Sequence, residues 1–230
     1  MSKVVGVILA GGSGDRFGAV KPKQFTDVFG RTVIEYTVDA FEQNEGIEEI
    51  VIVTRADYIS WVNEIVGKNN WRKVRHVVPG GKERYHSTLA AVDLYSDEDK
   101  LIIHDAVRPL VSQRIIDDCI AALDKYNAVD VAVKAVDTII QVDENECICG
   151  VPYRPMLRNG QTPQCFRRAT IRRAYEIALQ DPGFKTTDDC GVVFKYLPDE
   201  PVYVVEGEYR NLKLTNPEDL VILKHYLGER

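Results

Sequence analysis

The chain has 230 residues, of which 45% are hydrophobic and 28% charged, and its formal net charge is −6. This composition is typical of a globular protein, and the negative charge argues against duplex nucleic acid as a partner. The sequence contains no run of 18 apolar residues and its N-terminus lacks the features of a signal peptide, so we expect a cytoplasmic protein without membrane spans. Its five cysteines include no C-x-x-C pair, which favours free thiols.

Apolar runs alternate with segments of helical periodicity over the first part of the chain. The apolar runs predict buried strands at 4–9, 49–54, 74–78, 101–104 and 129–136, and the periodic segments predict helices at 32–44, 58–67, 83–95 and 112–125. This alternation indicates an α/β, Rossmann-like fold with a mostly parallel, twisted sheet and helices on both faces. Ligands of such sheets bind beyond the C-terminal strand ends, so we expect the loops after Leu9, Val78 and His104 to surround one crevice.

The pattern changes at residue 137, where two short strands, 138–142 and 147–151, flank an acidic turn and predict a β-hairpin. The hairpin offers no apparent core face, so we expect 137–158 to protrude as an arm that takes part in a homodimer. Beyond the arm, the pattern predicts helices near 167–179 and 188–196, strands at 202–205 and 212–214, and a last helix from Pro217. We therefore expect residues 1–230 to form one domain with an arm.

A glycine-rich loop follows the first predicted strand. Residues 7–25 read VILAGGSGDRFGAVKPKQF, with Gly11, Gly12 and Gly14 followed by Arg16, Lys23 and a further lysine. Glycines allow backbone N–H groups to surround a polyanion, because no Cβ blocks the approach. The loop therefore predicts a site for a triphosphate or a sugar phosphate. Its spacing fits neither the P-loop nor the dinucleotide fingerprint, and an ordinary strand-to-helix turn with exposed lysines is the alternative.

Two further segments carry candidate binding residues. Asp105 stands at the C-terminal tip of the strand at 101–104, where a hard carboxylate suits Mg²⁺; the alternatives are a helix cap or a partner for Arg108. Gly80 and Gly81 open a second glycine loop that leads into a helix, whose N-terminus attracts anions. Lys213 stands between two leucines on a predicted strand, so its side chain should point away from both.

These segments resemble one family in their order along the chain. The opening L-A-G-G-x-G-x-R-F-G with P-K-Q-F is similar to the start of cytidylyltransferases that act on polyol phosphates, either 2-C-methyl-D-erythritol 4-phosphate or ribitol 5-phosphate. H-D-A-V-R-P at 104–109 resembles the family's H-D-A-A-R-P, and matches to G-G-x-x-R-x-x-S, T-P-Q-x-F, T-D and N-L-K-L-T follow. The resemblance runs from Val7 to about Leu220 and implies the nucleotide-diphospho-sugar transferase type of Rossmann-like fold.

The resemblance implies transfer of CMP from CTP to a polyol phosphate, with Mg²⁺ as cofactor and pyrophosphate as leaving group. It assigns the nucleotide to Ala10, Gly11, Gly12, Gly14, Gly81, Arg84, Ser87 and Asp105, and the metal to Asp105. Arg16, Lys23 and Lys213 are implied to be catalytic, because they neutralise phosphate charge. Arg154, from a neighbouring subunit, is also implied to be catalytic, and it is expected to hold the acceptor together with Thr162 and Thr187.

The acceptor is the least determined feature. Gly160, Cys190 and Lys82 are closer to the ribitol branch, so ribitol 5-phosphate is slightly favoured over methylerythritol 4-phosphate. A transferase that uses UTP and a sugar 1-phosphate, and an inactive nucleotide-binding regulator, are the remaining alternatives.

Overall fold

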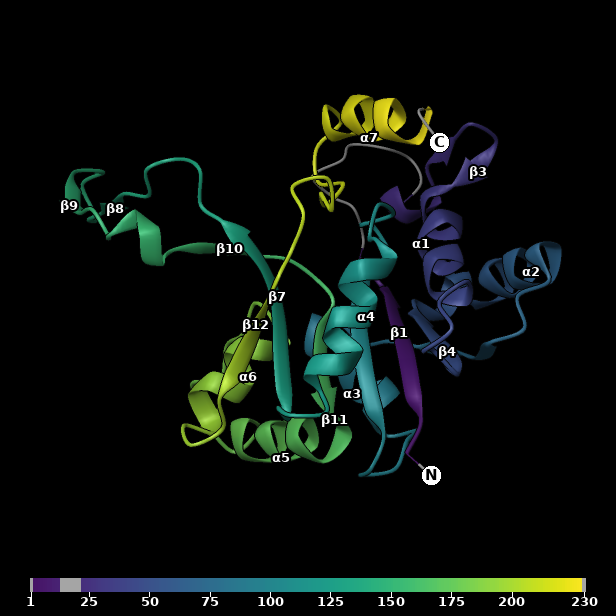
Figure 1. The fold of residues 1–230 in the computed structure, drawn as a ribbon, viewed down its shortest axis with the longest axis horizontal. Helices are drawn as coiled ribbons and strands as arrows, with labels where there is room; N and C mark the ends of the chain where they lie inside the picture. Colours follow the sequence, from purple (N-terminus) through teal and green to yellow (C-terminus); the bar gives the residue numbers. More distant parts are fainter. Residues whose placement is uncertain (1, 13–21, 229–230) are drawn as a thin grey trace.

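The computed structural model describes residues 2–12 and 22–228. Within these residues the main sheet has eight strands (Figure 1). Seven follow the order β10 (Arg158–Gly160), β7 (Ala128–Lys134), β11 (Gln164–Arg167), β6 (Lys100–Asp105), β1 (Val4–Ala10), β4 (Glu49–Thr54) and β5 (Val74–Pro79), and β12 (Val202–Glu206) also pairs with β7. The pairs among β6, β1, β4 and β5 are parallel, as is β12 with β7, whereas β10 and β11 run antiparallel to their neighbours. The predicted mostly parallel sheet is therefore confirmed.

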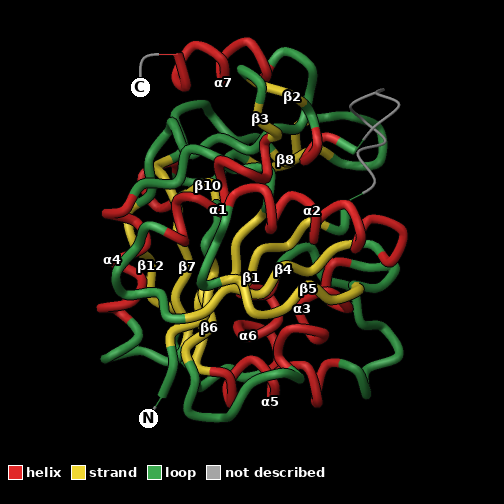
Figure 2. Tube along the Cα trace, turned by 90° about the vertical axis from the view of Figure 1, so that its right-hand side faces the viewer, coloured by secondary structure: helices red, strands yellow, loops and turns green. Residues whose placement is uncertain are grey.

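Helices cover both faces of this sheet, as predicted (Figure 2). One face packs on α1 (Val33–Glu42), α2 (Ile59–Asn69) and α4 (Gln113–Ala122), and the other on α3 (Arg84–Val92), α5 (Arg168–Ala178) and α6 (Asp189–Tyr196). Each face of the sheet has its own hydrophobic core, because successive side chains of a strand point to opposite faces. On β1, Ile8 packs in the core beneath α1, α2 and α4, and Val7 packs in the core beneath α3, α5 and α6; both are fully buried. Strands buried on both faces are apolar at nearly every position, which is why the sequence showed them as apolar runs.

A third, smaller apolar cluster lies above the C-terminal ends of the strands. It joins the short hairpin of β2 (Asp27–Val28) and β3 (Arg31–Thr32) to the last helix, α7 (Asp219–Gly228), through Val28, Leu223 and Leu227. Leu214 is fully buried in the same cluster, and its N–H donates to the carbonyl of Val107, 2.9 Å away. The cluster thus holds the chain around residue 213 beside the loop that follows β6.

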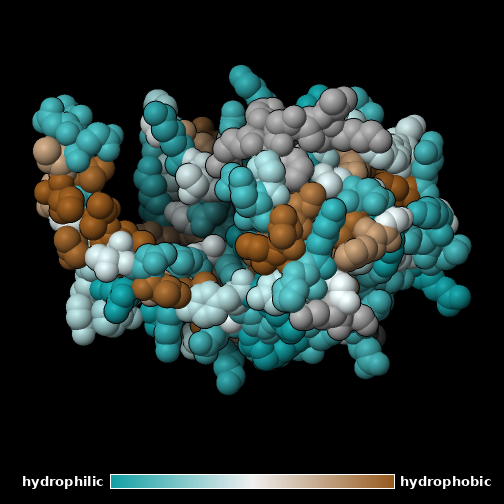
Figure 3. Space-filling model, turned by 90° about the horizontal axis from the view of Figure 1, so that it is seen from above, coloured by the Kyte–Doolittle hydropathy of each residue, from teal (hydrophilic) through white to brown (hydrophobic). Residues whose placement is uncertain are grey.

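The arm extends away from the sheet between β7 and β10 (Figure 1). Its hairpin, β8 (Gln141–Val142) and β9 (Ile148–Gly150), is antiparallel as predicted, although both strands are shorter than expected. Apolar side chains gather on the arm and remain exposed (Figure 3), namely Val136, Ile139, Ile140, Val142, Ile148, Val151, Tyr153 and Met156. Contiguous exposed apolar surface is typical of interaction sites.

Several predicted boundaries differ from the structure by a few residues, one predicted strand is absent, and four short strands were not predicted, namely β2, β3, β10 and β11. The helix expected to end at Gly67 continues to Asn69, and Asn70 stops it in the left-handed conformation (φ 54°), which asparagine tolerates. No strand forms at 212–214. The short antiparallel strands β10 and β11 have no apolar run or alternation long enough to be recognised in the sequence.

Two expectations concern the chain as a whole. All five cysteines are free, as predicted. Of the described part of the chain, no helix has both the length and the apolar character that crossing a bilayer requires.

Candidate active site

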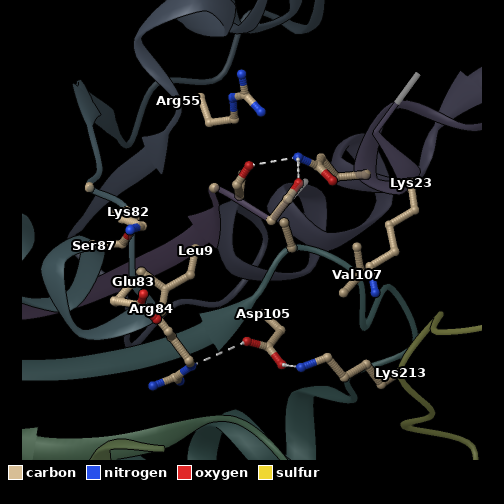
Figure 4. A pocket seen from close by; sticks show the side chains of 16 residues that line it. Leu9, Lys23, Arg55, Lys82, Glu83, Arg84, Ser87, Asp105, Val107 and Lys213 are labelled. Atoms are coloured by element: carbon tan, nitrogen blue, oxygen red, sulfur yellow. Dashed lines mark hydrogen bonds and ion pairs between the residues drawn. The ribbon is translucent and has the colours of Figure 1, made fainter. Parts of the chain in front are cut away.

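A cavity of about 640 Å³ lies at the C-terminal ends of the central strands. The loops after Leu9 and His104 and the second glycine loop, which follows β5, meet around it, as the sequence predicted (Figure 4). Its lining includes nine residues that the sequence assigned to a site: Ala10, Gly11, Gly12, Lys23, Gly81, Arg84, Ser87, Lys213 and, at the floor of the cavity, Asp105. Gly14 and Arg16 lie outside the described residues.

The first glycine loop is held by a neighbouring side chain that sequence reasoning missed. The short 3-10 helix η2 (Lys23–Phe25) buries Gln24, whose Nε2 donates to the carbonyls of Ala10 (2.7 Å) and Gly12 (3.1 Å). These bonds fix the loop where β1 ends. They also place Lys23, the residue before Gln24, at the cavity.

The second glycine loop brings α3 close to the end of β4. A Cβ on Gly80 would lie 2.3 Å from Oγ of Ser87 and 3.2 Å from a methyl group of Val53, so only glycine fits this approach. Ser87, nearly buried on α3, lines the cavity as a result. Arg84 is the first residue of α3, and its side chain crosses the cavity floor towards Asp105 (Figure 4).

Three cations surround the carboxylate of Asp105. Nζ of Lys213 lies 2.8 Å from Oδ2, Nε of Arg108 lies 3.8 Å from the same oxygen, and Nε of Arg84 lies 3.9 Å from Oδ1. Burial alone would raise the pKa of this carboxyl, but Lys213, Arg84 and Arg108 together hold the pKa well below its usual range. Asp105 is therefore ionised. Its carboxylate can bind a metal ion when the neighbouring cations pair with phosphate oxygens instead.

Lys213 reaches this carboxylate although the predicted strand around it is absent. Leu214 is fully buried and Leu212 partly buried in the cluster under α7, so the backbone directs the lysine between them to the opposite side. The expectation that Lys213 points away from both leucines therefore holds, and it points into the cavity (Figure 4).

Thr162 lies behind Asp105, outside the cavity lining. Its side chain is almost fully buried, and its hydroxyl accepts a hydrogen bond from the backbone N–H of Asp105 (3.2 Å). Asn211 is another buried residue that the sequence did not single out. Its side-chain amide donates to the backbone carbonyl of Thr162 (2.8 Å), and its backbone carbonyl accepts a hydrogen bond from Nη1 of Arg108 (2.8 Å). This network supports the floor of the cavity from below.

Arg154 and Thr187 are not brought to the cavity within one chain. Arg154 stands on the arm, in the 3-10 helix η4 (Arg154–Met156), where its Nη1 donates to the carbonyl of Val136 (3.0 Å). Thr187 is exposed in the segment that leads into α6. Arg55, at the end of β4, lines the cavity and was missed, because one arginine after an apolar strand has no distinctive pattern.

The fold and the cavity define a nucleotidyltransferase: a glycine loop, an ionised aspartate and lysines meet at the C-terminal edge of an α/β sheet. The model of the 2-C-methyl-D-erythritol 4-phosphate cytidylyltransferase (IspD) family matches residues 4–229, and the chain belongs to this family.

The chain is similar both to a relative named for CDP-ribitol and to relatives named for 2-C-methyl-D-erythritol 4-phosphate. The bifunctional ribulose 5-phosphate reductase/CDP-ribitol pyrophosphorylase Bcs1 of Haemophilus influenzae is 47% identical over 96% of the chain, which spans about half (47%) of that relative's length. The 2-C-methyl-D-erythritol 4-phosphate cytidylyltransferase of Thermobifida fusca is 45% identical over 98% of this chain and 93% of its own. The crystal structure of 4-diphosphocytidyl-2C-methyl-D-erythritol synthase from Anaerococcus prevotii superposes with a TM-score of 0.86 at 33% identity, covering 99% of this chain and 96% of that one.

Proposed function

We propose that this chain transfers CMP from CTP to a polyol phosphate and releases pyrophosphate. The observation that carries the proposal is the ionised Asp105 between Lys213 and Arg84, at the floor of a cavity bordered by two glycine loops. A phosphate oxygen of the acceptor attacks the α-phosphorus of CTP, and the bond to the β-phosphate breaks. The acceptor phosphate needs no general base, because its second pKa of roughly 6 leaves it ionised near neutral pH.

Charge neutralisation is the main task of the protein in such a reaction. Gly11, Gly12 and Gly14 surround the triphosphate with backbone N–H groups. Lys23 and Arg16 stabilise the leaving pyrophosphate, and Lys213 neutralises the α-phosphate as negative charge builds there. The position of Lys213 beside Asp105 supports this role, since the same lysine can move from the carboxylate to a phosphate oxygen.

We propose Mg²⁺ as the cofactor and Asp105 as its protein ligand. Among the described residues, no group of three His, Cys, Asp or Glu side chains could form a complete metal site. The residues present nevertheless fit Mg²⁺, which typically takes one or two carboxylates and completes its shell with waters and substrate phosphates. When bound there, the ion supplies positive charge to the phosphates of CTP. Asp105 holds that charge at the end of β6.

A homodimer with shared sites is the assembly that we propose. The apolar side chains of the arm are exposed in the single chain, and a second copy of the chain, related by two-fold symmetry, buries them. Because Arg154 is far along the arm from its own cavity, it serves the acceptor phosphate in the partner's site. Thr187 holds the acceptor phosphate together with Arg154, and Thr162 serves the acceptor by supporting Asp105.

For the acceptor we favour ribitol 5-phosphate. The markers are Gly160, Cys190 and Lys82, and the Haemophilus influenzae relative, which is named a CDP-ribitol pyrophosphorylase, agrees with them. Only Lys82 of these three lines the cavity, whereas Cys190 is buried in the core, so the other two act as markers and not as contacts. The family match and the Thermobifida fusca relative favour the second candidate, 2-C-methyl-D-erythritol 4-phosphate.

The test is pyrophosphate release by the purified chain with Mg²⁺, CTP and each acceptor in turn. We expect turnover with CTP and a higher kcat/KM for ribitol 5-phosphate, because a pocket that pairs extra hydroxyls rejects an analogue that leaves its polar groups unpaired. A preference of about tenfold or more for methylerythritol 4-phosphate would assign the second candidate. Turnover with UTP and a sugar 1-phosphate in place of CTP would contradict the cytidylyltransferase proposal, and no turnover at all would indicate an inactive regulator.

A further inference from the structure

Asp189 is a fully buried carboxylate that the proposed reaction does not use. It is the first residue of α6 and lies outside the cavity lining. Its two oxygens have different partners: Oδ2 pairs with Nη1 of Arg84 and Oδ1 accepts a hydrogen bond from the hydroxyl of Tyr175, both at 2.5 Å. Its backbone N–H donates to Oε1 of Gln164, 2.9 Å away. The first turns of α3 and α6, helix α5 and strand β11 therefore meet at this one residue.

Arg84 stands between two carboxylates at very different distances. Nη1 touches Asp189 at 2.5 Å, whereas Nε is 3.9 Å from Asp105, beyond hydrogen-bond distance. An arginine on a long flexible stem takes the orientation in which its fork is paired. The buried Asp189 thus holds the guanidinium along the cavity floor and keeps it from closing on Asp105.

We propose that Asp189 is a positioning residue for nucleotide binding, which orients Arg84 in the cavity and leaves Asp105 accessible. This inference rests on the proposed function, in which Arg84 contacts CTP and Asp105 holds the metal. Without the negative charge of Asp189, Arg84 turns to Asp105, the other carboxylate with which it forms an ion pair. It then leaves its place at the nucleotide and competes with Mg²⁺ for Asp105.

The decisive variant is Asp189→Asn, which removes the charge and keeps the shape. We expect the KM for CTP to rise about tenfold and the Mg²⁺ concentration for half-maximal rate to rise with it, while kcat at saturating CTP and Mg²⁺ stays within about threefold. The matched control is Tyr175→Phe, which removes the other bond to the same carboxylate and leaves the Arg84 ion pair in place. This control should lower the melting temperature without changing the KM for CTP.

A double variant separates positioning from a merely structural role. If Asp189 acts through Arg84, then Arg84→Gln and Arg84→Gln/Asp189→Asn should have the same KM for CTP, because the residue to be oriented is already gone. This comparison also applies if Asp189→Asn alone does not fold, since the double variant buries no unpaired charge. A further loss in the double variant, or an unchanged KM in a folded Asp189→Asn, overturns the proposal. Absence of CTP turnover in the wild-type chain would instead overturn the proposed function, so the two failures are distinguishable.

Discussion

The hydroxyl of Thr162 lies 2.9 Å from Nδ1 of the fully buried His104. On the other side of the ring, Nε2 lies 3.1 Å from the carbonyl of Arg108, which can only accept a hydrogen bond, so Nε2 carries the proton and Nδ1 accepts from Thr162. The same hydroxyl accepts from the N–H of Asp105. A neutral imidazole therefore connects both ends of the turn 105–108 and holds the backbone that carries the Asp105 carboxylate.

This arrangement makes stability depend on pH through His104. Burial lowers the pKa of His104 to about 4, whereas an unfolded histidine titrates near 6.5. Between these values the unfolded chain binds a proton that the folded chain does not, so the contribution to stability is complete above pH 6.5 and is lost as the pH falls towards 4. From pH 6.5 to pH 5 the loss amounts to about 2 kcal/mol.

Urea unfolding of wild type and His104→Gln at pH 5, 6 and 7 measures this contribution. The variant should be less stable at pH 7 and should lose less stability on acidification, because the two proteins differ in no other titratable group. Parallel stability curves for the two proteins would contradict the assignment of a neutral buried ring.

Replacement of Asp105 by asparagine should remove most of the activity. The variant loses the charge that attracts Mg²⁺ and leaves Lys213, Arg84 and Arg108 without their shared partner, so we expect kcat/KM to fall by about 10²-fold or more. The control is Asp124→Asn, because Asp124 is an exposed aspartate that pairs with Lys100 at the start of β6, the opposite end of that strand. Near wild-type turnover of Asp105→Asn at saturating Mg²⁺ would contradict the metal assignment; circular dichroism checks that the variant is folded.

Lys23→Ala and Lys213→Ala should each lower kcat by about 10²-fold, as expected when a preorganised charge next to a developing anion is removed. Lys195→Ala is the matched control, because Lys195 lies on the surface of α6, paired with Asp181. Steady-state kinetics with CTP as the varied substrate distinguishes the two possible roles. A rise in KM with unchanged kcat would assign the lysines to uniform binding of ground state and transition state.

The arm should be needed for association and for activity. Deleting the turn 143–146 should shift the chain from dimer to monomer at micromolar concentration, as measured by sedimentation. Arg154→Ala and Lys213→Ala should each retain only a small residual activity, yet a refolded equimolar mixture should recover about a quarter of wild-type activity, because half of the dimers are mixed and one of their two sites is intact. No recovery in mixtures shown to contain mixed dimers would contradict a site shared between subunits, as would a fully active monomer.

Local patterns in the sequence predicted most of the architecture and part of the site. Apolar runs and helical periods record which face of each element is buried, so β1, β4, β5 and β6 and their helices were predictable from neighbouring residues alone. The glycine loops and Asp105 were predictable for a related reason: in a parallel sheet, residues after successive strands meet at one edge.

The contacts that hold the site had to come from the tertiary structure. Arg84 and Asp189 are separated by 105 positions, and Thr162 and His104 by 58, so no local period connects them. Both pairs depend on the insertion of the short antiparallel strand β11 between β6 and β7, which the sequence does not reveal. Lys213 likewise reaches Asp105 because Leu214 packs under α7, and not because of a strand. Which side chains meet is decided by strand order and packing, whereas sequence periodicity encodes only the conformation and the buried face of each element.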